Sequence, residues 1–313
     1  MVLKTVTTIT FAMLTVGLVM GCTGSEGPAE SAPAVYLGQA SPGKTPELFG
    51  PGSISGELDV HSYPVFSPDG KEVYWSAFRQ SFADQKIYCM KNESGVWSSP
   101  ELAPFMGEMI GGNPVFSPDG ERIYFNARRP PQQPDTRGPT DLWYVQREGQ
   151  GWSEPVLVGL SEGDRPLHSQ VCFGGDGYLY FPAEREESKG GADIYRIRLE
   201  GDTVGPVEEL PGELNGETHD VQPYIAPDGS YMIFVSLQRD DCMGWTDLYI
   251  SFRNEDGSWT EAKNLGAPIN SPETEMFPYV TSDGKYFFFM SARNGKNHVY
   301  WVDASVIDDI RPE

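Results

Sequence analysis

Histidine and carboxylate side chains recur at one position of a repeated sequence pattern. Five units share an Asp-Gly pair, and three residues before the proline of each unit (or before Val171, which replaces it) stand His61, Gly111, His168, Asp220 and Glu275. His219 directly precedes Asp220. If the units form a ring, these side chains converge on one point. Imidazole and carboxylate groups that converge can bind a divalent metal or act as general acid and base.

The metal hypothesis assigns a divalent cation to four of these residues: His61, His168, His219 and Glu275. The alternative is that they are hydrated or hydrogen-bonded residues at the rim of a channel, which needs no ligand. We assign no catalytic residue from the sequence.

Arginine recurs at a second position of the repeat. These residues are Arg79, Arg128 with Arg129, Arg185, Arg239 and Arg293. Because they belong to the repeat itself, we favour a structural role in which each arginine binds a carboxylate or carbonyl of a neighbouring unit. The alternative role is recognition of an anionic ligand, such as a uronate sugar or a carboxylate-bearing peptide.

Trp245 lies in a long loop with Cys242 and Met243. An exposed tryptophan can stack on a sugar ring or anchor a protein partner, and a packed one covers its own unit. Both alternatives stay open. The candidate binding-face residues are therefore His61, His168, His219, Asp220, Glu275, Arg128, Arg185, Arg239, Trp245 and Arg293.

The elements that must position these residues are short strands. The pattern Pro-Val-Phe-Ser-Pro-Asp-Gly at 64–70 recurs at 114–120, with weaker copies at 171–177, 223–229 and 278–284. An aromatic-rich segment follows each Asp-Gly pair, which is typical of a β-hairpin. A third strand and then a fourth segment follow; the fourth starts with Trp97, Trp152 or Trp259, but in the third unit with Val204.

Four strands in each unit of about 50 residues predict an all-β chain that folds as a β-propeller. The number of units predicts five four-stranded blades. The fifth unit lacks a fourth strand, and residues 45–49 supply a strand at the other end of the chain. We therefore expect the N-terminal strand to complete the last blade and close the ring.

The Ser-Pro-Asp-Gly hairpin, the Tyr-Phe-x-Ser strand and the Asp-Ile-Tyr strand resemble the WD40-like repeats of the TolB family over residues 45–303. This resemblance implies a propeller that binds a protein or glycan of the cell envelope. Oligogalacturonate lyases of the same family imply the alternative, a metal-assisted carbohydrate-active enzyme. The repeat units contain no α/β-hydrolase domain, which argues against a peptidase of the serine-hydrolase type.

The N-terminus has the features of a bacterial lipoprotein. Lys4 precedes an apolar stretch that ends in Gly21-Cys22, which predicts a signal peptide at 1–21 and a lipid anchor on Cys22. Residues 22–43 are rich in Gly, Ser, Pro and Ala and predict a flexible tether. The propeller is assigned to 44–305 and a C-terminal tail to 306–313. Thr23 after the cysteine favours the outer membrane of a Gram-negative bacterium.

The formal net charge of −22 makes nucleic acid an unsuitable partner, because phosphate binding needs a basic surface. We expect contact with the membrane only through the lipid anchor. Cys89 and Cys172 lie in apolar strand patterns and predict buried thiols, whereas the pairing of the three cysteines after Cys22 stays open.

Overall fold

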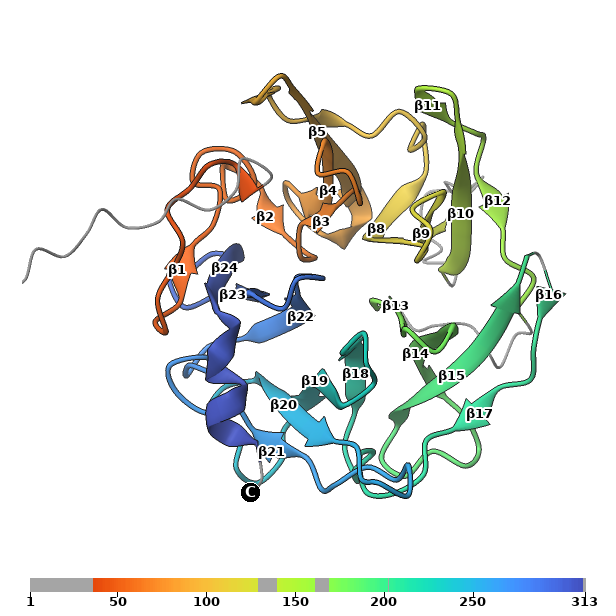
Figure 1. The fold of residues 1–313 in the computed structure, drawn as a ribbon, viewed down its shortest axis with the longest axis vertical. Helices are drawn as coiled ribbons and strands as arrows, with labels where there is room; N and C mark the ends of the chain where they lie inside the picture. The colour runs from red at the N-terminus through yellow and green to blue at the C-terminus, as the bar shows by residue number, and fades with distance from the viewer. Residues whose placement is uncertain (1–35, 129–139, 161–168, 202, 312–313) are drawn as a thin grey trace, which may run out of the picture.

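The structure is a computed structural model that describes residues 36–128, 140–160, 169–201 and 203–311. Over these residues the strands form five antiparallel sheets, arranged as blades around one axis (Figure 1). The chain is therefore a five-bladed β-propeller, which confirms the predicted class and blade number. In this part of the chain no helix is both long and apolar enough to cross a membrane.

Blades 1 and 2 each contain two long central strands and short outer pieces; the inner strand is short in blade 1 and long in blade 2. In blade 1 the strands are β2 (Asp59–Val60), β3 (Val65–Phe66), β4 (Glu72–Phe78), β5 (Lys86–Glu93), β6 (Val96–Trp97) and β7 (Glu101–Leu102), with the 3-10 helix η2 (Phe82–Asp84). In blade 2 they are β8 (Ile110–Phe116), β9 (Arg122–Arg128), β10 (Asp141–Glu148), β11 (Gly151–Trp152) and β12 (Val156–Leu157).

Blades 3 and 4 repeat this plan, with the innermost strand first along the chain. Blade 3 consists of β13 (Cys172–Phe173), β14 (Tyr178–Glu184), β15 (Ala192–Glu200), β16 (Thr203–Val204) and β17 (Glu208–Glu209). Blade 4 consists of β18 (Asp220–Ile225), β19 (Tyr231–Leu237), β20 (Thr246–Phe252) and β21 (Lys263–Asn264).

Blade 5 joins the two ends of the described chain. Its strands are β22 (Glu275–Val280), β23 (Tyr286–Ser291), β24 (His298–Asp303) and β1 (Glu47–Leu48), followed by the 3-10 helices η4 (Ala304–Val306) and η5 (Asp308–Ile310). Strand β1 pairs antiparallel with β24, with Glu47 opposite Trp301 and Leu48 opposite Tyr300. The expected closure of the ring by the N-terminal strand is confirmed.

The Asp-Gly pairs form tight turns between the first and second strands of the blades. Gly70 has a φ of +67°, a conformation that glycine adopts at little cost. Asp69 Oδ1 accepts hydrogen bonds from Ser67 Oγ (2.7 Å) and from the Lys71 backbone N–H (3.1 Å). The same arrangement at Ser117 and Asp119 holds the pKa of the Asp119 carboxyl below its ordinary value, because hydrogen bonds stabilise the carboxylate. These bonds explain why Ser, Asp and Gly recur together.

Apolar side chains fill the seams between neighbouring blades. One buried cluster joins blades 5, 1 and 2, a second joins blades 3, 4 and 5, and a third joins blades 2 and 3. Strand β23 contributes to two of them, since Phe288 faces the first cluster while Phe287 and Phe289 face the second. Each blade is therefore buried on both faces.

Residues outside the predicted propeller boundaries also pack against the blades. Tyr36 lies in the segment assigned to the tether, yet its ring is buried edge-to-face against Phe66 and Tyr286. At the other end, Ile307 is buried in the second cluster, although it was assigned to the tail. Packing against the propeller therefore begins before residue 44 and continues after residue 305. The signal peptide and Cys22 lie outside the described residues.

Candidate functional site

The candidate residues lie on one face of the propeller, built from two sets of loops. One set joins the second and third strands of each blade, and the other leads into the innermost strand of the next blade. Members of the two sets touch: Lys189 Nζ donates to the Asn215 carbonyl (3.2 Å), and the Trp245 backbone N–H donates to the Glu273 carbonyl (3.1 Å). Both loop sets therefore belong to the same face, as the repeat predicts.

Asp220 begins the innermost strand of blade 4 and is fully buried. Arg239 Nη2 donates to both carboxylate oxygens, at 2.9 and 3.0 Å. Ser236 Oγ (2.6 Å) and the Gly216 backbone N–H (2.6 Å) also donate to the carboxylate. Burial raises the pKa of the Asp220 carboxyl, and the charge of Arg239 opposes that rise. The carboxylate is thus bound by groups of its own fold.

Glu275 has equivalent surroundings at the start of β22 in blade 5. It is fully buried and accepts hydrogen bonds from Ser291 Oγ (2.6 Å), Ser271 Oγ (2.6 Å) and the Ser271 backbone N–H (2.9 Å). Arg293 Nη2 lies 3.5 Å from Glu275 Oε1. Arg293 Nη1 also donates to the Pro268 carbonyl (3.1 Å), in the loop that enters the blade.

Arg239 and Arg293 therefore bind buried carboxylates and loop carbonyls. Arg239 Nη2 reaches the Leu214 carbonyl (3.3 Å), just as Arg293 reaches Pro268. The role is structural, as the repeat favoured, but each arginine braces its own blade rather than a neighbouring unit. Their charges are largely neutralised, and each fixes the entry loop of its blade in place.

The arginines of the other blades differ from this pattern. Arg185 Nε donates to Glu187 (2.5 Å) within the same loop, and its guanidinium lies 5.5 Å from the centre of the Tyr195 ring. Arg79 is exposed on the loop of blade 1. Arg128 ends β9, and Arg129 lies outside the described residues. A common bracing role is therefore established only for Arg239 and Arg293.

His61 is buried among aromatic rings near the axis. Its ring contacts Phe82 and Phe277 edge-to-face, each at 4.6 Å between ring centres. His61 Nδ1 and Gln85 Nε2 are hydrogen-bonded at 3.1 Å. Because Phe277 belongs to the innermost strand of blade 5, His61 lies at the seam between blades 1 and 5.

His219 lies elsewhere on this face, at the seam between blades 3 and 4. It is exposed, and its Nδ1 accepts a hydrogen bond from the Ala192 backbone N–H (3.2 Å). A β-carbon on Gly191 would come within 2.6 Å of the His219 ring, so only glycine leaves room for the imidazole there. Although His219 directly precedes Asp220 in the sequence, its side chain does not lie at the same point as the Asp220 carboxylate.

Among the described residues, no three His, Cys, Asp or Glu side chains are placed to hold one metal ion. Asp220 and Glu275 are held by arginines and hydroxyl groups, and His61 and His219 lie at different seams. His168, the third histidine of the predicted set, lies outside the described residues. The divalent-metal hypothesis therefore stays a prediction.

Phe82 is an exposed aromatic residue that the sequence analysis did not select. Its side chain is 57% exposed, although it lies beside His61 and Phe78 (5.0 Å between ring centres). The Asp84 carboxylate accepts hydrogen bonds from the backbone N–H groups of Arg79 (3.3 Å), Gln80 (3.2 Å) and Ser81 (3.3 Å), which fixes the loop around η2. Ser81 and Asp84 form a capping box that could have been recognised, but capping boxes do not reveal which neighbour is exposed.

Trp245 is 63% exposed, so its indole does not pack down onto its own blade. Its loop is held by Asp247, whose carboxylate accepts from the backbone N–H groups of Met243 (2.7 Å) and Gly244 (3.1 Å). The backbone of Trp245 is bound to Glu273 at the entrance of blade 5. Phe82 contacts His61, whose ring in turn contacts Phe277 on the innermost strand of the same blade. Two exposed rings on well-ordered loops thus flank the entrance of blade 5.

No known family description and no curated protein matches the sequence. Solved structures match its fold. TolB from Acinetobacter baumannii is 15% identical with a TM-score of 0.50, over 79% of this chain and 53% of TolB, so the chain spans about half the length of that protein. A glycoside hydrolase is 12% identical with a TM-score of 0.56, over 87% and 92% of the two chains.

An endo-arabinase from Bacteroides thetaiotaomicron is 17% identical with a TM-score of 0.50, over 80% of this chain and 95% of that enzyme. At these identities the similarity establishes the fold alone. The expected resemblance to TolB-like propellers is therefore confirmed as a shared propeller fold, and the same fold is found in carbohydrate-processing enzymes.

Proposed function

We propose that this chain is a lipid-anchored envelope protein whose propeller binds a protein or a glycan across the entrance of blade 5. The observation that carries the proposal is the exposure of Phe82 and Trp245 on loops that hydrogen bonds hold in place. Large exposed aromatic residues are enriched where proteins recognise partners. Because the loops are already ordered, little conformational entropy is lost on binding.

The chemistry of this face favours binding over catalysis. Asp220 and Glu275 are the buried carboxylates nearest to where the innermost strands begin, and each is surrounded by donors of its own fold. A carboxylate bound in this way is poorly suited to exchange a proton with a substrate. Flat aromatic rings, in contrast, need only a ligand with an apolar face, such as a sugar ring.

Substitution of the two rings tests this function. We expect Phe82→Ala and Trp245→Ala each to weaken binding about tenfold or more, as is typical of central aromatic contacts. Calorimetry with arabinan and oligogalacturonate fragments would measure glycan binding, and cross-linking to envelope proteins would measure protein binding. Val96→Ala is the matched control, because Val96 is also exposed but lies on outer strand β6. Equal binding by all three variants would exclude this face.

The lipid anchor requires its own test, because Cys22 lies outside the described residues. Replacing Cys22 with Ser removes the thiol that would carry the diacylglycerol. We expect the protein to move from the membrane fraction to the soluble fraction of the producing cells. If Cys22→Ser leaves the protein with the membrane, the anchor lies elsewhere or does not exist.

The alternative function is a metal-assisted carbohydrate-active enzyme. Its support is the fold shared with the glycoside hydrolase and the endo-arabinase. This mechanism predicts about one divalent ion per chain, since such an ion would offset the charge of a uronate substrate. Metal analysis by mass spectrometry, on the parent chain and on His61→Ala with His168→Ala, would test it.

A further inference from the structure

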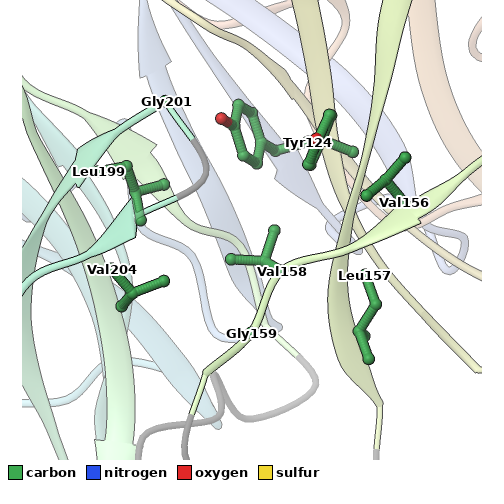
Figure 2. Close-up of a pocket in the computed structure, with 9 residues that line it drawn as sticks. Tyr124, Val156, Leu157, Val158, Gly159, Leu199, Gly201 and Val204 are labelled. Atoms are coloured by element: carbon green, nitrogen blue, oxygen red, sulfur yellow. The ribbon is translucent and has the colours of Figure 1, made fainter.

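An apolar pocket opens on the outer wall of the propeller, away from the face described above. It lies in the seam between blades 2 and 3 and has a volume of about 140 Å³. Figure 2 shows Val156 and Val158 lining one side, and Leu199 and Val204 lining the other. Two tyrosines, Tyr124 and Tyr144, complete the lining together with Leu157, Gly159 and Gly201.

The preceding seam, between blades 1 and 2, has a tryptophan in the equivalent place. Strand pairing shows the equivalence, because Trp152 lies opposite Arg147 in blade 2 and Val204 lies opposite Leu199 in blade 3. The Trp152 ring packs 6.3 Å from Phe105, and its Nε1 donates to Tyr74 Oη (2.8 Å). This indole fills its seam and hydrogen-bonds to the blade before it.

The pocket between blades 2 and 3 exists because Val204 is much smaller than the indole that stands at the equivalent position of blade 2. Tyr124 is the counterpart of Tyr74, since Tyr124 pairs with Val115 as Tyr74 pairs with Val65. Tyr124 Oη accepts a long hydrogen bond from Arg122 Nη1 (3.4 Å), in place of the short bond that Tyr74 receives from Trp152. The pocket therefore has the walls and the acceptor of an indole site.

We propose that this pocket binds an aromatic side chain of the tryptophan type, supplied by a partner protein. The indole ring would pack between Val158 and Val204 and donate its N–H to Tyr124 Oη. The exposed residues Val156 and Leu157 would be covered at the same time. Burial of such a ring, together with one directed hydrogen bond, is the arrangement expected at the centre of a protein interface.

The charge of this wall favours particular residues on either side of the tryptophan in the partner segment. Glu200, beside the lining residues Leu199 and Gly201, is exposed, and so is Glu154 close to Val156; one cation, Arg122, reaches the Gly201 carbonyl (3.2 Å). The whole chain carries a formal charge of −22. A partner segment with Lys or Arg on both sides of the tryptophan is therefore attracted to this wall, and an acidic segment is repelled.

Short peptides and substitutions in the pocket test the proposal with the full-length chain. We expect the peptide Lys-Trp-Lys to bind, and Lys-Ala-Lys and Asp-Trp-Asp each to bind at least about tenfold more weakly. Val204→Trp should abolish binding and raise the melting temperature, because it supplies the indole that the repeat has elsewhere. Thr203→Trp, at the exposed neighbouring position, should leave binding unchanged.

Leu157→Asp provides a second test that does not depend on refilling the pocket. Leu157 is 49% exposed, so an aspartate there should be tolerated by the fold and should still abolish binding of Lys-Trp-Lys. Unchanged binding by Val204→Trp or Leu157→Asp would overturn the proposal. Three other results would also overturn the proposal. Equal binding of Lys-Ala-Lys would show that charge alone drives binding, and stronger binding of octanoate would show that the pocket takes an acyl chain. A dimer that Val204→Trp dissociates would show that a second copy of this chain occupies the pocket.

Discussion

At the residue scale, the ion pair of Asp220 with Arg239 shows how a polar group is kept inside the propeller. The carboxylate is fully buried and accepts four hydrogen bonds from three donors, which belong to Gly216, Ser236 and Arg239. The arrangement contributes specificity as well as binding energy, because no other orientation of the entry loop satisfies all of these groups. The cost is that removing one of these groups leaves the others buried without their partner.

We expect Arg239→Ala to lower the free energy of unfolding by about 3–5 kcal/mol, since it leaves a buried carboxylate without its counter-charge. Urea unfolding at pH 7 would measure the change. Arg79→Ala, at the equivalent exposed position of blade 1, is the control and should change stability by less than about 0.5 kcal/mol. Similar values for the two variants would show that Arg239 does not brace its blade.

Asp193 of blade 3 has less favourable surroundings than its counterpart Asp247 of blade 4. Asp247 accepts from Asn264 Nδ2 (2.7 Å), whereas Glu209 takes the place of Asn264 in blade 3. Asp193 Oδ1 is buried and has no hydrogen-bond partner among the described residues. Burial, with a contribution from Glu209, raises the pKa of the Asp193 carboxyl. Its charge therefore destabilises the fold above that pKa.

Glu209→Asn copies the arrangement of blade 4 and should stabilise the chain by about 1 kcal/mol at pH 7. The gain should shrink as the pH falls through the raised pKa of Asp193 toward the ordinary value of 3.8, because the carboxyl is then protonated in both states. Unfolding in urea at several pH values would show this. Glu261→Asn, an exposed change, should give no such pH dependence; a constant gain across pH would contradict the explanation.

The sequence predicted which residues are equivalent, but not where each side chain points. Counting along the repeat placed Asp220 and Glu275 at matching sites, and the structure confirms matching surroundings. The same counting could not show that His219 turns over Gly191, because that depends on the loop of the preceding blade. The sequence did not single out Phe82, because an exposed phenylalanine has no sequence pattern of its own.

At the element scale, strand β1 completes blade 5. Only Glu47 and Leu48 pair as a strand, but Phe49 continues the contact, with its backbone N–H bound to the Val299 carbonyl (2.9 Å). The Phe49 ring is fully buried against Phe288 (4.9 Å) and Trp301 (5.0 Å). The closure therefore depends on a buried aromatic ring as well as on strand hydrogen bonds.

We expect Phe49→Ala to cost about 3–5 kcal/mol, since it empties a fully buried aromatic site. Thermal unfolding followed by circular dichroism would measure it. Leu102→Ala removes an exposed side chain from outer strand β7 and should have little effect. A small loss of stability for Phe49→Ala would mean that the propeller closes without the contribution of β1.

The strands and turns could be predicted from the sequence because Asp-Gly turns and aromatic-rich strands recur in every unit. The exchange of tryptophan for Val204 was equally visible. The pocket that results was not, because its depth depends on how blade 2 meets blade 3, and Tyr124 and Val158 come from different elements. Local patterns determine the strands, whereas the seams depend on contacts between distant segments.

At the scale of the whole molecule, neighbouring blades share their buried clusters, and the last blade packs against the first. No blade can lose its packing without exposing apolar surface on two neighbours. We therefore expect a single cooperative unfolding transition. Tryptophan fluorescence and far-ultraviolet circular dichroism should report the same midpoint, and Arg239→Ala and Phe49→Ala should shift both signals together. Two separate midpoints would indicate blades that unfold independently.

The closure of blade 5 also sets the order in which the propeller can be completed during synthesis. Ser55 Oγ binds the backbone N–H of Val299 at 3.0 Å, and the two residues are 244 positions apart. The segment around Ser55 thus waits until the strand that contains Val299 has been synthesised. Until then Phe49 lacks its two nearest ring contacts, Phe288 and Trp301, and the edge of β24 does not yet exist. The nascent chain must stay unaggregated while the intervening blades are translated, which makes it a natural client for chaperones that hold unfolded chains.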